Sequence, residues 1–138
     1  MNKLQLAEIT RDPNILDELS KDKSWNVRCR VANNPNTSSK TLDYLSRDEY
    51  YSVRWEVARN SNISSETLDK LSKDEDNVVR YWVAEHPNTT PETLKQMAIV
   101  EENYWLKYYI KNNPNCSEET WKYLSALELL KTLPKVST

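Results

Sequence analysis

Apolar positions recur along the chain with the spacing of short helices, and the pattern returns about every 26 residues. Val27, Val53 and Val79 keep this interval, and each is followed four positions later by another valine. Valines at i and i+4 lie on one face of a helix, which we name helix B. A second short segment carries leucines three residues apart, such as Leu42 and Leu45, and we name it helix A. The pattern therefore predicts a repeated two-helix unit.

Polar residues mark where these helices begin and end. Side chains that can accept hydrogen bonds from a first helical turn precede each helix A: Asp12, Ser38, Ser64, Thr90 and Ser117. Pro13 and Pro91 follow directly, at the helical position where proline is tolerated. The Asn-Pro-Asn sequence at 34–36 and 113–115 is predicted to end helix B and to start the next unit. Because the chain contains no glycine, we expect asparagine to adopt the left-handed conformation at helix ends.

A two-helix unit cannot bury its apolar face alone, whereas stacked units can. The sequence therefore predicts an all-α fold, with a single α-solenoid domain over residues 1–138. About four repeats are expected, at approximately 12–37, 38–63, 64–89 and 90–116, with one extra residue in the last. Residues 1–11 keep a fragment of helix B as one cap. A longer helix over 117–133 is expected to cover the other end, and 134–138 to form a tail.

The phrase VRCRVANNPNTSSKTL at 27–42, with copies that begin at 53, 79 and 106, resembles the leucine-rich repeat variant family of bacterial proteins. That family is close to HEAT-like α-solenoids, and the resemblance covers roughly residues 12–125. It implies a right-handed superhelix of paired short helices. Some family members carry a cysteine-rich iron–sulfur segment near the N-terminus. This chain has only Cys29 and Cys116, so the resemblance does not extend to that chemistry.

Composition and motifs give little support to catalysis. The sequence has no HExxH or CxxC motif, no nucleophile elbow, and no glycine for a phosphate-binding loop. His86 occupies the position of Asn34, Asn60 and Asn113, so it is interpreted as a turn residue. We expect a protein without enzymatic activity, cofactor or metal. The absence of a signal-like start, of a long apolar run and of paired cysteines predicts a cytoplasmic protein that does not insert into a membrane.

Charged residues form two columns in the repeats. One is basic (Arg28, Arg54, Arg80 and Lys107) and the other is acidic (Asp22, Asp48 and Asp74). The basic column could bind a row of phosphates. Alternatively, the arginines and aspartates of the two columns could pair with each other and stabilise the repeated fold. We favour pairing, because Val100 stands in the acidic column where lysine replaces arginine in the basic one.

The residues after each conserved Val-Arg pair vary from copy to copy, and many are aromatic. They are Cys29-Arg30, Trp55-Glu56, Tyr81-Trp82 and Tyr108-Tyr109. At about 100° per residue these positions lie ~200° and ~300° from the inward valine, so we expect them to point outward. Tyr, Trp and Arg are the usual anchors of protein interfaces. The alternative is that these rings fill space between neighbouring repeats.

The sequence thus predicts a non-catalytic protein-binding module that acts as an adaptor, regulator or inhibitor. Its expected binding surface consists of Trp55, Tyr81, Trp82, Tyr108 and Tyr109, rimmed by Arg30 and Arg59. The partner would be a protein with an acidic or apolar segment. Basic residues outnumber acidic ones on helix B, so a nucleic-acid-binding solenoid that uses the same face is the alternative. Self-association into a homodimer through the aromatic residues is a further candidate.

Overall fold

The computed structural model describes residues 1–135, and within this range it contains ten helices and no strand. The helices are α1 (Lys3–Ile9), α2 (Pro13–Leu19), α3 (Trp25–Asn33), α4 (Ser39–Leu45), α5 (Tyr51–Arg59), α6 (Ser65–Leu71), α7 (Asn77–Glu85), α8 (Pro91–Val100), α9 (Tyr104–Asn112) and α10 (Glu118–Thr132). The all-α prediction is confirmed for these residues. The end of the expected tail, 136–138, lies outside the described residues.

Each helix A (α2, α4, α6, α8 and the start of α10) begins after the capping residue predicted from the sequence. Ser38 and Ser64 accept hydrogen bonds from the backbone N–H groups of Thr41 and Thr67, both at 3.2 Å. Thr90 and Ser117 cap α8 and α10 in the same way, and Asp12 caps α2 by accepting from the Asn14 N–H. These caps hold the short helices in register, since a helix of seven residues is barely stable alone.

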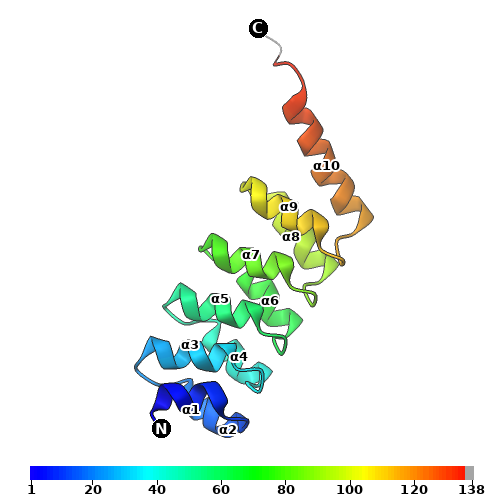
Figure 1. Cartoon of the computed structure of the whole chain (residues 1–138). Coiled ribbons are helices and arrows are strands. Elements are labelled where there is room, and N and C mark those ends of the chain that lie inside the picture. The colour runs from blue at the N-terminus through cyan, green and yellow to red at the C-terminus, as the bar shows by residue number, and fades with distance from the viewer. Residues whose placement is uncertain (136–138) are drawn as a thin grey trace.

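The B helices form one row, and the A helices lie beside it. Helices α1, α3, α5, α7 and α9 pack successively on one another, and each of α2, α4, α6 and α8 packs on the B helix that follows it. Figure 1 shows the row as a staircase that rises from the N-terminus. Val57 and Val83 from the B helices and Leu42 and Leu68 from the A helices are fully buried in one continuous core.

The B helices end without any left-handed residue, so that expectation was wrong. No residue in 1–135 has a positive φ, and the cap residue Asn34 is extended, with φ −71° and ψ 126°. Asparagine is used here for its side chain instead. The Asn60 amide donates to the backbone oxygens of Ala32 and Asn34 at 2.8 and 3.0 Å, which satisfies carbonyls of the preceding unit. Its Oδ1 accepts from the Asn62 N–H at 2.9 Å.

At the end of α7, His86 makes hydrogen bonds equivalent to those of Asn60, as predicted for a turn residue. Its Nε2 lies 3.0 Å from the Asn60 backbone oxygen, and its Nδ1 lies 3.0 Å from the Asn88 backbone nitrogen. A backbone N–H can only donate, so Nδ1 must accept and Nε2 must carry the proton. The network therefore holds His86 as the neutral imidazole. Burial also lowers its pKa, more than the bond to the Asn60 oxygen raises it.

We predict that His86 makes the fold less stable in mild acid. Its pKa is lowered from 6.5 in the folded state, so the unfolded chain binds a proton first as the pH falls. Its contribution to stability is fully present above pH 6.5. It is lost as the pH falls from 6.5 through the lowered pKa of the folded state. Urea unfolding of wild type and His86→Asn between pH 7.5 and 5 should show that the variant loses less stability. Equal slopes for the two proteins would contradict this prediction.

Candidate binding surface

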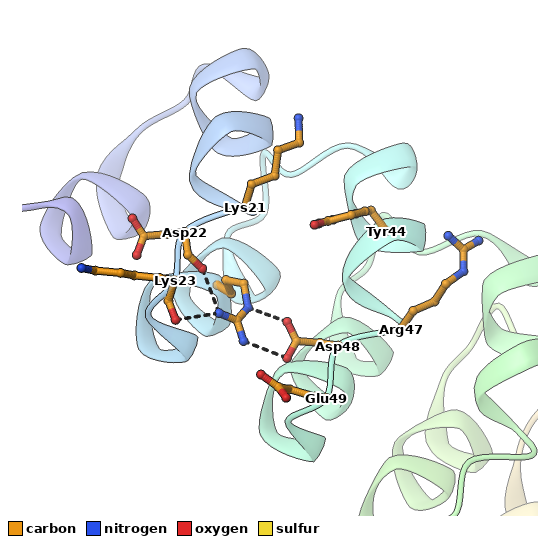
Figure 2. Close-up of a pocket in the computed structure, with 8 residues that line it drawn as sticks. Lys21, Asp22, Lys23, Tyr44, Arg47, Asp48 and Glu49 are labelled. Carbon is orange, nitrogen blue, oxygen red and sulfur yellow. Dashed lines mark hydrogen bonds and ion pairs between the residues drawn. The ribbon is translucent and has the colours of Figure 1, made fainter.

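The three arginines of the basic column connect successive units of the fold. Figure 2 shows a pocket whose lining includes Asp22, Lys23 and Asp48. Arg28 also lines this pocket, and its guanidinium bridges two successive units. Nε and Nη2 of Arg28 donate to the Asp48 carboxylate at 2.6 and 3.1 Å. Nη1 donates to the backbone oxygens of Asp22 and Lys23 at 2.8 and 3.2 Å. With most of its N–H groups engaged, Arg28 has little left to offer a phosphate.

The same bridge recurs up the row. Arg54 pairs with Asp74 at 2.8 Å and Arg80 with Glu101 at 2.9 Å. The pairing predicted from the sequence is confirmed, but the acidic column does not stop at Val100 as the sequence suggested. The one extra residue of this repeat moves the acid one position further along the chain, to Glu101, which is the C-cap residue of the ten-residue helix α8.

The aromatic residues predicted as a binding surface lie in one connected group across α5, α7 and α9. Trp55 stacks on Trp82 with 6.2 Å between ring centroids, and Trp82 meets Tyr81 edge-on at 4.9 Å. Tyr81 contacts Tyr109 at 4.7 Å, and Tyr109 contacts Tyr108 at 5.4 Å. We call these five residues the ring cluster. Edge-on and offset contacts of this kind are favourable arrangements of aromatic rings.

The prediction that these rings point outward is correct for Tyr108, whose exposed fraction is 48%, and only partly correct for the others. Trp55, Tyr81, Trp82 and Tyr109 are half-buried and pack against the core. Consecutive B helices lie side by side, so a large ring on one helix reaches across to the next. Both readings of the sequence therefore hold in part: the rings fill space between units and still present an edge or face to solvent.

Arg59 stacks on two of these rings, whereas Arg30 faces an acidic residue of α1. The Arg59 guanidinium carbon sits 5.5 Å from the Trp55 ring centroid and 4.8 Å from that of Trp82. Its Nη1 is 3.3 Å from a Glu56 carboxylate oxygen, and burial raises the pKa of that carboxyl group. Arg30 is 3.9 Å from Glu8 of α1. Arg59 is thus positioned by ring stacking and by one acid.

The basic surplus expected on the B helices is largely neutralised in the structure. Helices α3, α5, α7 and α9 carry seven basic side chains, and among residues 1–135 all except Lys107 lie within 4.0 Å of a carboxylate. The pairs are Arg28–Asp48, Arg30–Glu8, Arg54–Asp74, Arg59–Glu56, Arg80–Glu101 and Lys111–Glu128. The i, i+3 spacing of Glu56 and Arg59 could have revealed one pair in advance. The pairs between distant segments could not be recognised in this way, because no short sequence spacing connects their two residues.

No protein-family model, curated protein or solved structure matches the chain. Among residues 1–135, no helix combines the length and apolar character needed to cross a membrane. The same range contains no group of three or more His, Cys, Asp or Glu residues that could hold a metal ion.

Proposed function

We propose that this protein is a non-catalytic, cytoplasmic protein-binding module of the leucine-rich repeat variant type. In this proposal the chain is a right-handed α-solenoid of about four two-helix repeats with capping ends. The ring cluster, with Arg59 stacked on it, is the partner-binding surface. The observation that carries the proposal is that the ring cluster is continuous over three successive B helices. The arginines of the basic column, in contrast, are bound to carboxylates within the fold.

Packing of the rings favours their use as anchors. An interface pays an entropic cost for every side chain it must order, about 0.5–1.5 kcal/mol for a flexible one. Trp55, Trp82 and Tyr109 are already held by neighbouring rings and by the core, so a partner would order them at little cost. Tyrosine hydroxyl groups can also meet the partner's hydrogen-bonding groups, whereas Trp55 Nε1 is buried and has no hydrogen-bond partner among residues 1–135.

The charge pattern favours a protein partner over a nucleic acid. Phosphate recognition draws its affinity from cations that replace the counterions of the backbone. Arg59 is the basic residue stacked on the ring cluster, and it already faces Glu56. An apolar or aromatic segment, with one acidic group near Arg59, suits this surface better than a continuous chain of phosphates.

We predict that a Tyr108→Ser, Arg59→Ser variant loses its partner while a matched control keeps it. The control is Tyr44→Ser on α4, since the exposed fractions of Tyr44 and Tyr108 are nearly equal at 50% and 48%. Tagged wild type and both variants would be used to capture proteins from host-cell lysate, with and without nuclease. A protein recovered by wild type and Tyr44→Ser, but reduced about tenfold or more with the double variant, is the expected result.

Two outcomes would contradict the proposal. Capture that disappears after nuclease treatment would favour the nucleic-acid alternative. Equal capture by all three proteins would mean that the ring cluster serves packing between units and not recognition. Circular dichroism melting of each variant keeps these outcomes apart from a loss of fold.

A further inference from the structure

Helix α10 packs on α8 and α9 through one of its sides only. On that side Leu124 is buried and Leu127 packs against the core. Figure 1 shows the C-terminal half of α10 extending past α9 and away from the row of B helices. Helix α10 therefore covers the end of the row in part, and the side of its C-terminal half opposite Leu124 faces solvent.

A stripe of apolar side chains runs along this uncovered side. Ala126, Leu129, Leu130 and Leu133 are spaced i, i+3, i+4 and i+7, so they lie on one face of the helix and of its cap residue. All four are exposed, and the exposed fractions of the three leucines, in chain order, are 67%, 63% and 61%. We call these four residues the leucine stripe. Exposed apolar side chains gathered in this way mark interaction sites more often than scattered ones do.

A hollow lies at the other end of the same helix, between α8 and α10. Its volume is about 220 Å³, and it is lined by Lys95, Ala98, Ile99, Glu119, Thr120 and Tyr123. This volume is below the roughly 300 Å³ of the smallest common ligand pockets and suits an aliphatic side chain. Tyr123 precedes Ala126 by three residues and Leu130 by seven, so the hollow adjoins the leucine stripe along α10.

The two ends of α10 also differ in charge. Glu118 and Glu119 lie in the first turn, and their side chains are exposed to 81% and 77%. Both are paired with a lysine of the same chain, but such exposed pairs are weak, so the carboxylates remain accessible to a further cation. Lys131 lies in the last turn, and the exposed Lys135 follows the helix. Helix α10 is thus acidic beside the hollow and basic beside the leucines.

We propose that two copies of the chain associate through α10, with the two helices antiparallel about a two-fold axis. The leucine stripe of each copy then covers Tyr123 and the hollow of the other, and the basic end of each helix lies near the acidic end of its partner. Ala126 lies near the middle, where a small side chain lets the two backbones approach closely. The surface is therefore self-complementary, as a two-fold interface requires, whereas a parallel pair would bring the acidic ends together.

This interface is separate from the ring cluster and shares no residue with it. Self-association through α10 therefore does not depend on the function proposed for the ring cluster. Four stripe residues and one hollow on each copy form a small interface, so we expect a weak dimer with a Kd of about 10–100 µM.

Sedimentation equilibrium of the whole chain, at concentrations on either side of this value, should show a monomer–dimer equilibrium. Leu130→Ser should weaken the dimer about tenfold or more, and Ile9→Ser should leave it unchanged. Ile9 on α1 is the matched control, because its exposed fraction of 61% is close to the 63% of Leu130. Circular dichroism melting shows that each variant is folded. A wild-type protein that stays monomeric, or equal dimerisation of all three proteins, would overturn the inference.

An exchange of charges tests the antiparallel arrangement. Glu119→Lys and Lys135→Glu should each weaken the dimer, because like charges then face each other at both ends of the helix pair. An equimolar mixture of the two variants should form a mixed dimer about threefold or more tighter than either variant alone. A mixture that associates no better than the separate variants would overturn the inference. A dimer that Tyr108→Ser dissociates and Leu130→Ser does not would assign self-association to the ring cluster and overturn it as well.

Discussion

Replacing Arg54 with leucine is expected to lower the free energy of unfolding by about 3–5 kcal/mol. The Arg54 and Asp74 side chains are exposed to only 10% and 8%, so the substitution leaves a carboxylate with little water and no counter-charge. It also frees the backbone oxygens of Asp48 and Glu49, which accept from Arg54 at 2.9 and 3.3 Å. Urea unfolding at pH 7, followed by circular dichroism, measures the change directly.

Arg47→Leu is the matched control for this measurement. Arg47 pairs with Asp43 one helical turn away on α4, but its side chain is exposed to 62%, so we expect a change within about 0.5 kcal/mol. Adding Asp74→Asn to Arg54→Leu should recover part of the loss. It removes the stranded charge and keeps an oxygen for the Asp76 N–H, which donates to Asp74 at 2.9 Å. If Arg54→Leu proved as mild as Arg47→Leu, the bridge between units would not be a main support of the fold.

Asn60→Ala should cost about 2–4 kcal/mol, because it leaves buried hydrogen-bonding groups of two units unsatisfied. The amide donates to the oxygens of Ala32 and Asn34, and its oxygen accepts from the Asn62 N–H. The control is Asn112→Ala: the Asn112 amide also donates to a backbone oxygen, that of Tyr108 at 2.7 Å, but in an exposed position. We expect the control to change stability by less than about 0.5 kcal/mol. Similar losses for both variants would contradict the role given to Asn60.

Much of the frame could be predicted from the sequence because its signals are local. The helix starts depend on residues such as Ser38 and Ser64, whose side chains bond an N–H three residues ahead. The Arg–Asp pairing was also accessible, since both columns repeat with the period of the fold. The position of Glu101 was not, because it depends on how far α8 continues before it ends. The conformation of Asn34 was missed because its side chain bonds a distant carbonyl, that of Ala7 at 2.9 Å.

The side of the B helices on which the candidate rings lie was predictable from the sequence, but their burial was not. Helical periodicity gives the direction of Trp55 and Tyr81 relative to the core-facing valines, and nothing more. Whether a ring in that direction meets solvent or the next helix depends on the distance between B helices, which tertiary packing sets. For the same reason, the charge balance around Arg30 depended on Glu8, which only the fold brings near. These contacts change the interpretation of the surface from basic and aromatic to nearly neutral and aromatic.

The most direct test of the ring cluster as a binding surface is site-specific photo-crosslinking in host cells. A photoreactive phenylalanine analogue would replace Tyr108 in one protein and Tyr44 in another, two positions of nearly equal exposure on different faces of the repeat row. Irradiation should give a discrete covalent adduct with one host protein from position 108 and none from position 44. An adduct from position 44 alone, equal adducts from both positions, or no adduct from position 108 would contradict the proposed binding surface.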